Sequence, residues 1–373
     1  MDNPRNLIIC IDGTNNEPGV AKTNVQRLFR VLVKEPGRQL VYYQPGVGTL
    51  DPVGTMGALR RSGLRLLDAM NAWMMQRHVG AAYRYLCEHY MPGDRIFLFG
   101  FSRGAYAVRV LAGMLSTVGL LYPGMQEMYP FAWKLYASYD PRSMSAGRRA
   151  PYYQATRSFI TSYARTVKVH FAGLWDTVSS VGNPWRPKVF YRTQKNNGVS
   201  IVRHAVSLDE RRTLFVQNLW GDASTGQDIR QVWFAGVHAD VGGGYKTGVD
   251  SQLAEIPFAW MLREAEQAGL MVDAEAVRKA RLPRHPKQVR HRAKGPMHDE
   301  LIAHPWWRLL EHAPIPRRTR CGDGWGPLNY RAHRGRARML FDGALIHYSV
   351  FERMIADDAY QPVNLPGRVV IVD

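Results

Sequence analysis

Residues 94–115 join two apolar runs through a short turn that carries glycines, in the order DRIFLFGFSRGAYAVRVLAGML. The first run predicts a buried strand over Arg95–Phe101, and the second has the residue spacing of a helix. Gly100 and Gly104 stand two residues before and two residues after Ser102. Because small residues at these positions allow a strand and a helix to cross closely, the stretch favours a strand, a strained turn with the serine at its apex, and a helix.

Further apolar runs rich in β-forming residues alternate with helical segments along the chain. Together with the first strand, they cover Leu7–Asp12, Gln39–Tyr43, Arg95–Phe101, Val167–Trp175 and Gln231–Val237. The longest helix is predicted over Gly63–Tyr90, with Ser62 as its N-cap. Continuous apolar strands that alternate with helices are typical of a parallel sheet covered on both faces. We therefore predict an α/β protein with an α/β-hydrolase-like, mostly parallel sheet, helices on both faces, and a basic cap or insertion.

A basic region begins near residue 281. Between Arg278 and Arg338 the chain has sixteen Lys or Arg and four Asp or Glu, a net charge of +12 within a total of +18. Such a charge attracts polyanions or anionic membrane surfaces, and a solvated basic face is the alternative explanation. We expect three parts: a catalytic core over residues 1–280, a basic insertion or cap rich in Trp and Arg over 281–340, and a C-terminal segment over 341–373. This last segment is expected to pack back on the core, and its closing LPGRVVIVD predicts a final strand.

The three cysteines, Cys10, Cys87 and Cys321, are widely spaced and indicate neither a disulfide framework nor a zinc site. The apolar run before Asp12 is only about five residues long, which is too short for a signal peptide. No stretch approaches the roughly 18 apolar residues that a membrane-spanning helix needs. We therefore expect a chain made in the cytoplasm with reduced thiols, although a non-classical export route would leave no such trace.

The strand, turn and helix around Ser102 are typical of the nucleophile elbow of α/β-hydrolases. The serine hydroxyl then projects from the carboxyl edge of the sheet. The backbone N–H of Arg103 faces the oxygen on which negative charge develops, near the positive end of the helix. The sequence thus predicts Ser102 as a nucleophile and Arg103 as an oxyanion-hole residue, while a structural serine in a glycine-flanked turn is the alternative.

A serine nucleophile needs a base and a group that orients the base, and in α/β-hydrolases these follow later strands in the order Ser, Asp or Glu, His. The predicted strands in VKVHFAGLWDTV and IRQVWFAGVHAD end at Asp176 and His238. Both side chains should emerge at the same sheet edge as Ser102. We therefore predict Ser102, Asp176 and His238 as the catalytic residues, with Asp240 as an alternative acid and His347 as an alternative base.

The stretch NLIICIDGTNN, residues 6–16, also resembles the start of haloacid-dehalogenase-type phosphatases. Those enzymes need a second aspartate two residues before Asp12, and Cys10 occupies that position. A thiol cannot form the aspartyl-phosphate intermediate. We instead expect the loop after this strand to lie beside the nucleophile, with the N–H of Gly13 or Thr14 as the second oxyanion donor. Asp12 then shapes the turn by accepting local backbone hydrogen bonds.

Several segments resemble, in their order, those of a known family. They read DGTNN, YYQPGVGT, GFSRGAYAVR, LWDTV, SLDERR, VWFAGVHADVGGGY and YQPVNLP. The family consists of bacterial and fungal α/β-hydrolase domains and includes the first family of type VI secretion lipase effectors. The resemblance implies a Ser-Asp-His esterase, since characterised members are phospholipases A delivered into rival bacteria. By position it carries over the nucleophile Ser102, the acid Asp176 and the base His238.

Together these features predict a serine hydrolase that cleaves carboxylic esters through an acyl-enzyme, and the resemblance implies a phospholipase A-type lipase. Its substrate would be phospholipid or another ester, and no cofactor and no metal are expected. The family also implies type VI export to a target cell, while any immunity or secretion partner stays unidentified. A general intracellular esterase is the nearest alternative.

The composition of the basic segment indicates which partners it could contact. Trp306, Trp307 and Trp325 lie among arginines, a composition suited to an anionic membrane surface, so residues 281–340 are the expected membrane contact. A packed cap with an arginine-rich surface is the alternative. Nucleic acid is not expected, because the segment has no recognisable nucleic-acid-binding motif. A non-enzymatic basic module that binds anionic membrane or nucleic acid is the competing class of function.

Overall fold

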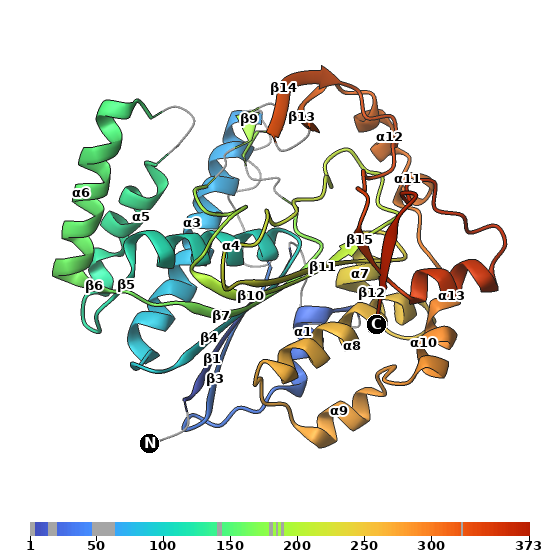
Figure 1. Cartoon of the computed structure of the whole chain (residues 1–373), viewed down its shortest axis with the longest axis horizontal. Helices are drawn as coiled ribbons and strands as arrows, with labels where there is room; N and C mark the ends of the chain where they lie inside the picture. Colours follow the sequence, from blue (N-terminus) through green and yellow to red (C-terminus); the bar gives the residue numbers. More distant parts are fainter. Residues whose placement is uncertain are drawn as a thin grey trace, which may run out of the picture.

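The computed structural model of the 373-residue chain describes residues 4–13, 21–46, 64–139, 144–178, 182–183, 186–187, 190–321 and 324–373. Side chains are described within these ranges except at 64–74, 182–187 and 315–329. Figure 1 shows a central sheet with helices on both faces, and a group of short helices with a hairpin beyond one edge of the sheet.

The central sheet has eight strands, and every neighbouring pair among them is parallel. This confirms the predicted α/β-hydrolase-like sheet. Because β1 lies between β3 and β4, the strand order reverses at β1, and the carboxyl ends of strands at such a point are where open α/β sheets bind ligands. In spatial order the strands are β16 (Val369–Val372), β15 (Ala344–His347), β11 (Asp228–Phe234), β10 (Val199–Ser207), β7 (Val169–Trp175), β4 (Arg95–Phe101), β1 (Asn6–Ile11) and β3 (Gln39–Gln44).

Helices cover both faces because successive side chains of a strand point in opposite directions. Leu7 and Ile9 of β1 pack in one buried apolar cluster, whereas Ile8 and Cys10 pack in the cluster on the other face. The first cluster includes residues of α3 (Leu64–His89), α4 (Arg103–Val118) and α5 (Tyr129–Ala137), and α6 (Ala146–Tyr163) lies beside α4. The second includes residues of α1 (Asn24–Val31), α8 (Gln252–Gln267), α9 (Ala274–Ala280) and α10 (Pro286–Ala293).

Helix α3 agrees with the predicted long helix to within one residue at each end. Val79, Tyr83 and Leu86 on its apolar stripe are fully buried, so this stripe packs in the core. Ser62, the predicted N-cap, lies outside the described residues.

Two strands of the sheet, β10 and β15, were not among the predicted runs. β10 contains Arg203 and His204, which interrupt its apolar pattern. Arg203 is buried, but it forms ion pairs with Glu264 of α8 and with Asp228, whose carboxylate lies 2.5 Å away. These partners compensate the burial of the charge. β15 has four residues, too few to stand out as a periodic segment.

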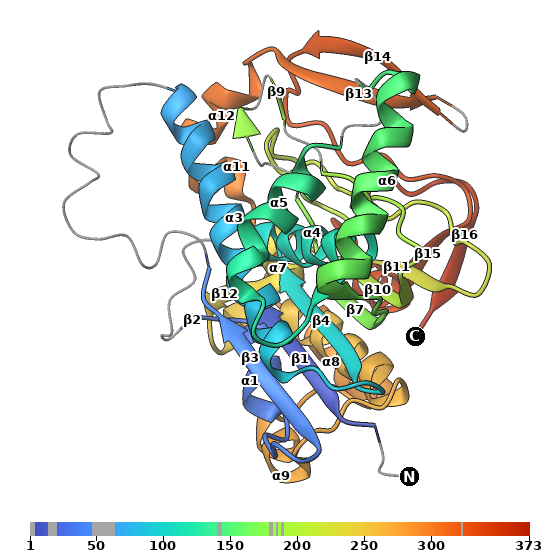
Figure 2. The ribbon, with the colours of Figure 1, turned by 90° about the vertical axis from the view of Figure 1, so that its left-hand side faces the viewer.

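The predicted basic insertion is divided between two places. α10 packs against α8 and against α13 (Ser349–Ala356). In contrast, α11 (Glu300–Ala303), α12 (Trp306–Glu311) and the hairpin of β13 (Ile315–Cys321) and β14 (Gly324–Arg331) lie beyond the carboxyl edge of the sheet (Figures 1 and 2). β15 and β16 then extend the sheet, and β16 is the final strand that the closing segment predicts.

Short elements complete the described structure. They are β2 (Ala21–Thr23), β5 (Leu120–Leu121), β6 (Ala164–Arg165), β8 (Gly182–Asn183), β9 (Arg186–Pro187), β12 (Gly243–Lys246), α7 (His238–Gly242), and the 3₁₀ helices η1 (Gln126–Met128) and η2 (Val249–Ser251).

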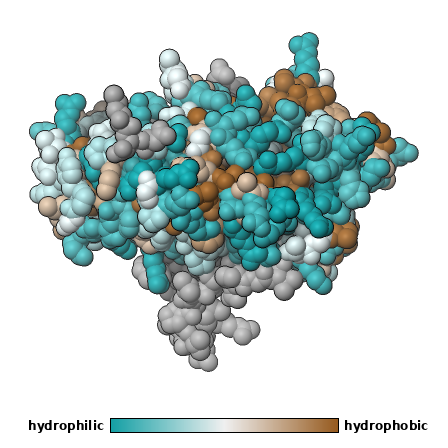
Figure 3. All heavy atoms as spheres, turned by 90° about the horizontal axis from the view of Figure 1, so that it is seen from below, coloured by the Kyte–Doolittle hydropathy of each residue, from teal (hydrophilic) through white to brown (hydrophobic). Residues whose placement is uncertain are grey.

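The surface seen from below is mainly hydrophilic, with small and separate hydrophobic patches (Figure 3). None of the helices in the described ranges is long and apolar enough to cross a membrane.

Candidate active site

Ser102 lies in a sharp turn between β4 and α4. Its backbone has φ 58° and ψ −124°, a conformation that residues other than glycine rarely adopt. A methyl group on Gly104 would lie 2.3 Å from the carbonyl oxygen of Ile11, and one on Gly100 would lie 2.6 Å from that of Gly104. This is the close crossing that the glycine spacing predicts, and it places the start of α4 against the end of β1.

Asp176 follows β7, the neighbour of β4 in the sheet. Phe101 and Trp175 are paired in register, so Ser102 and Asp176 begin the loops of two adjacent strands at the same level. The Ser102 N–H donates to the carbonyl oxygen of Trp175 at 3.0 Å. Asp176 also has a positive φ, 37°, and is 1% exposed. Both residues therefore occupy strained turns at the carboxyl edge of the sheet.

His238 is the first residue of α7, which follows β11, and it is buried. Its Nδ1 lies 2.5 Å from Oδ2 of Asp176. Its ring packs against those of Phe101 and Phe215, with centroid separations of 4.6 and 4.8 Å. Because Phe101 immediately precedes Ser102, the imidazole lies beside the turn that carries the serine.

Arg338, which the sequence analysis did not single out, completes the surroundings of Asp176. It lies between β14 and β15, and its Nη1 and Nη2 are 2.5 and 3.0 Å from the two carboxylate oxygens. Burial alone would raise the pKa of Asp176, but Arg338 and His238 outweigh it and hold this pKa well below its usual range. The carboxylate is therefore ionised at neutral pH. Nothing in the sequence distinguishes Arg338 from the other arginines of the basic segment.

Glu210 fixes the backbone of His238, and Arg212 in turn holds Glu210. The backbone N–H of His238 donates to Oε2 of Glu210 at 3.2 Å, and Nη2 of Arg212 donates to the same oxygen at 2.7 Å. Burial raises the pKa of Glu210, but the bond to Arg212 outweighs it and lowers that pKa. The Arg212 guanidinium lies 3.8 Å from the centroid of the Phe215 ring, which Trp307 contacts in turn. Glu210 and Arg212 belong to SLDERR, one of the segments that resemble the family, and no sequence pattern in it indicates this role.

The alternative residues lie elsewhere. The carboxylate of Asp240 is 2.7 Å from Nδ1 of His298 and accepts the Val237 N–H at 3.0 Å. His347 is buried at the end of β15, where its Nδ1 is 2.8 Å from Oγ of Ser349. Burial lowers the pKa of His347 to about 3. The structure thus brings Asp176 to His238, and gives Asp240 and His347 other partners.

The loop after β1 begins with Asp12, which is fully buried. Its carboxylate accepts the Gly13 N–H at 2.6 Å, the Thr23 hydroxyl at 2.7 Å and the Tyr43 hydroxyl at 2.8 Å. Asp12 therefore shapes the turn, as predicted. The bond engages the Gly13 N–H that we assigned to the oxyanion hole, and Thr14, the other candidate, lies outside the described residues.

The surroundings of Cys10 also argue against the phosphatase hypothesis, in which position 10 carries the nucleophile. Cys10 is fully buried in β1, and burial raises the pKa of its thiol well above the usual range. A protonated, enclosed thiol is not a nucleophile.

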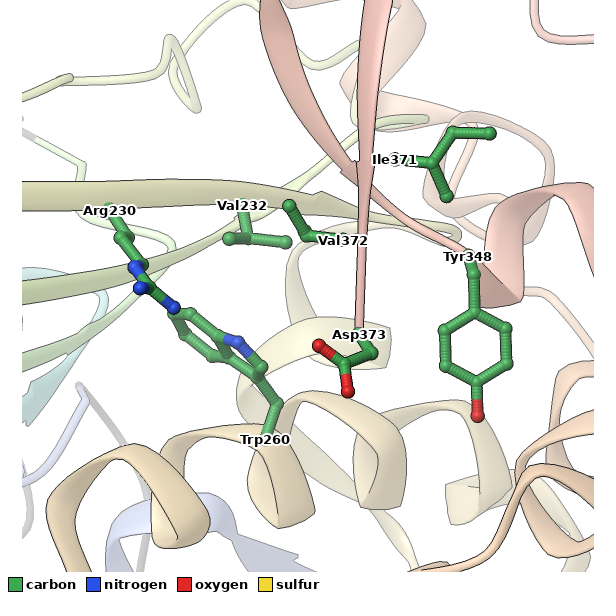
Figure 4. Close-up of a pocket in the computed structure, with 7 residues that line it drawn as sticks. All are labelled: Arg230, Val232, Trp260, Tyr348, Ile371, Val372 and Asp373. Carbon is green, nitrogen blue, oxygen red and sulfur yellow. The ribbon is translucent and has the colours of Figure 1, made fainter. Parts of the chain in front are cut away.

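A cavity of about 440 Å³ lies at another position, between β11, β16 and α8. Arg230, Trp260, Tyr348 and Asp373 are among the residues around it (Figure 4). Ser102, Asp176 and His238 do not line it. This cavity is therefore separate from the residues at the carboxyl edge.

Comparison with known proteins identifies the family. Residues 5–264 match the model of the catalytic domain of Tle1-like phospholipase effectors of the type VI secretion system. The chain belongs to this family. The match contains the predicted Ser102, Asp176 and His238, and it ends before Arg338.

Relatives of this Tle1-like chain differ widely in length and sequence. An uncharacterized protein of Saccharomyces cerevisiae is 41% identical over 223 residues, which is 57% of this chain but only 32% of that protein. The solved structure of a Tle1 effector bound to the VgrG spike has a TM-score of 0.50 and 13% identity, covering 99% of this chain and 94% of its own. An uncharacterized Pseudomonas aeruginosa protein gives a TM-score of 0.44 at 19% identity, covering 82% of this chain and 51% of its own. The Tle1 effector structure supports the fold.

Proposed function

We propose that this chain is a serine hydrolase of carboxylic esters and acts as a phospholipase A. The observation that carries the proposal is the hydrogen bond between Asp176 and His238 at the strand edge where Ser102 forms the elbow. Membership of a phospholipase effector family supports lipid as the substrate class.

The proposed reaction has two acyl-transfer steps. With Nδ1–H of His238 donating to Asp176, Nε2 is left as an acceptor and takes the proton from the hydroxyl of Ser102. The serine oxygen attacks the ester carbonyl, and His238 returns the proton to the leaving alcohol, which for a phospholipid is the lysophospholipid. Water then attacks the acyl-enzyme with His238 again as the base, releasing a fatty acid and regenerating Ser102.

The start of α4 favours stabilisation of the oxyanion near this serine. Arg103 is the first residue of α4, so its N–H has no acceptor within the helix and lies at the positive end of the helix dipole. The end of β1 contacts the elbow through Gly104, and the Gly13 N–H that follows it is engaged by Asp12, so Arg103 is the donor to which we assign the oxyanion. Each donor of this kind contributes about 3 kcal/mol to the transition state.

The surface beside the site suits a lipid interface. Ile302, Trp306 and Leu309 on α11 and α12 are 67%, 52% and 78% exposed. The neighbouring Trp307 contacts Phe215, which contacts His238, so this surface adjoins the catalytic histidine. We assign the anionic-membrane contact to these helices. Their apolar side chains suit the acyl chains of a lipid surface, and the basic residues of the segment suit its anionic headgroups.

The cell in which the enzyme acts is a separate question from the reaction that it catalyses. Membership of the effector family favours type VI export to a target cell, and a related Tle1 effector has been solved bound to VgrG. A lipase or esterase that acts in the cell that makes it is the alternative.

The proposal is tested by incubating the purified chain with phospholipid vesicles and analysing the products. We expect lysophospholipid and free fatty acid from the wild type and from His347→Gln, and none from Ser102→Ala or His238→Ala. Product release by Ser102→Ala would contradict the serine mechanism. Turnover of short soluble esters alone would contradict the lipid assignment.

A further inference from the structure

Arg338 reaches Asp176 from a distant part of the chain, the loop between β14 and β15. Its Nη1 also donates to the hydroxyl and the carbonyl oxygen of Ser207, at 2.6 and 3.0 Å, and its Nη2 to the carbonyl oxygen of Phe215, at 2.5 Å. The side chain is 3% exposed. The guanidinium is thus fixed by three different residues, and only Asp176 among them carries a charge.

Every acceptor position of the Asp176 carboxylate already accepts a hydrogen bond. Oδ1 accepts from the Ser207 N–H at 2.9 Å and from Nη1 of Arg338, and Oδ2 accepts from His238 and from Nη2 of Arg338. A carboxylate offers about four acceptor positions, and all of them are engaged. The arginine fork fixes both oxygens at once, so it sets the plane in which Oδ2 faces the imidazole.

The loop that carries Arg338 is itself anchored near the site. The buried Glu311 of α12 accepts the Gly335 N–H at 2.9 Å and, from the other direction, the Thr213 N–H at 2.5 Å. Beyond the arginine, the side-chain amide of Asn364 donates to the carbonyl oxygens of Arg338 and Leu208, at 3.1 and 3.0 Å. The loop is therefore held on both sides of Arg338, against the segment that follows β10.

We propose that Arg338 is the positioning residue of the catalytic acid, because its bidentate ion pair orients Asp176 toward His238. A residue beyond the family-matched range, 5–264, thus supports the set of Ser102, Asp176 and His238. The inference rests on the proposed serine mechanism. Arg338 acts through Asp176 and does not touch the reacting atoms. Its loss leaves a buried carboxylate that lacks its main counter-charge and two of its hydrogen bonds, so the carboxylate is less firmly oriented and easier to protonate.

Three variants test this role. Arg338→Ala removes the guanidinium, and Arg338→Lys keeps the charge without the fork. Arg353→Ala is the matched control, because Arg353 is also buried but donates to the backbone carbonyls of Ala293 and Gly295, away from Asp176. For each variant, kcat and KM are measured on a soluble ester, together with the rate of labelling by a fluorophosphonate probe. Circular dichroism and thermal unfolding report on folding.

We expect Arg338→Ala to lower kcat and the labelling rate by about 10- to 100-fold with little change in KM, since a misplaced catalytic group has an effect of this size. Arg338→Lys should fall between the wild type and the alanine variant, and Arg353→Ala should stay near the wild type. Added guanidinium ion, below denaturing concentrations, should restore part of the rate to Arg338→Ala only.

The pH profile gives a readout that a general loss of stability would not move. Within the described part of the chain, Arg338, Glu210 and His204 are the charged and titratable groups that interact with Asp176 or His238. Burial lowers the pKa of His204 to about 3, and Glu210 has a lowered pKa, so neither changes charge near neutral pH. Removal of Arg338 takes a positive charge away from the hydrogen-bonded Asp176–His238 pair, so the pair keeps its proton to higher pH. The acid limb of kcat/KM should therefore move to higher pH in Arg338→Ala.

The outcomes separate the two proposals. If the wild type is not labelled, the proposed function fails. If the wild type is labelled, and a folded Arg338→Ala reacts at the wild-type rate with an unchanged acid limb, the positioning role fails. If Arg338→Ala does not fold, Arg338→Lys takes its place. In a folded Arg338→Lys, which keeps the charge and loses the fork, wild-type kcat would overturn the inference, and a lowered kcat with little change in KM would support it.

Discussion

At the scale of single residues, backbone strain and buried polar groups concentrate around one turn. Ser102 and Asp176 both have positive φ although neither is glycine, a conformation that costs of order 1–3 kcal/mol per residue. The nearby Asp12 is buried, yet three donors satisfy its carboxylate. Strain at the predicted nucleophile and acid, beside a fully bonded Asp12, supports separate roles: chemistry for the first two and support of the loop for the third.

We therefore expect Asp12→Asn to keep its reaction with a fluorophosphonate probe within a few-fold of wild type. The remaining amide oxygen can still accept the Gly13 N–H, and the hydroxyls of Thr23 and Tyr43 can turn to accept from the new amide. The free energy of unfolding should fall by about 1–3 kcal/mol, the usual effect of disturbing a buried hydrogen bond. Labelling kinetics and urea unfolding measure the two effects. Complete loss of labelling in a folded Asp12→Asn would contradict this role and would indicate that Asp12 takes part in catalysis.

At the scale of elements, the sequence predicted those parts of the fold that local patterns specify. The strand and helix around Ser102 were predictable because apolar runs and two glycines define them locally. β10 was missed because Arg203 and His204 interrupt it, and their burial depends on Glu264 and Gln231, which lie far away in the sequence. Arg338 was missed for the same physical reason, since its role depends on a contact with Asp176 across 162 positions.

Two strands carry buried histidines that should make stability depend on pH. Burial lowers the pKa of His204 in β10 and of His347 in β15 to about 3 each, against about 6.5 in an unfolded chain. Between these values the unfolded state binds more protons, so stability is present above pH ~6.5 and is lost as the pH falls toward 3.

His347→Gln should therefore lose less unfolding free energy than the wild type between neutral pH and about pH 4.5, because it removes one buried histidine that binds a proton only on unfolding. Urea unfolding at several pH values measures the slope. His291→Gln, a substitution at an exposed position of α10, is the control and should follow the wild type. An unchanged slope in His347→Gln would show that this histidine does not contribute.

At the scale of the whole molecule, α11 and α12 lie beyond the carboxyl edge of the sheet (Figure 2). Ile302, Trp306 and Leu309 on these helices are exposed, and Trp307 contacts Phe215, which contacts His238, the predicted base. We expect a soluble ester or probe to reach the serine without using this surface. A phospholipid in a bilayer can reach the serine only after the enzyme has bound the membrane. Activity on the two kinds of substrate should therefore respond differently to changes on these helices.

Leu309→Asp should reduce hydrolysis of anionic vesicles by about tenfold, since it replaces an apolar contact with a charge of the same sign as the lipid. Labelling by a soluble probe should stay at the wild-type rate. Ile355→Asp is a matched control, because Ile355 on α13 has the same 78% exposure as Leu309 but lies on another helix. Equal losses in both variants, or no loss on vesicles in Leu309→Asp, would contradict a membrane contact at these helices.

The most direct measurement of the central claim is covalent labelling of the purified chain with a fluorophosphonate, followed by identification of the modified residue. We expect one labelled serine, Ser102, in the wild type, slow labelling in His238→Ala, and none in Ser102→Ala. An unlabelled wild type, or equal labelling of Ser102→Ala, would contradict a serine hydrolase built on this elbow.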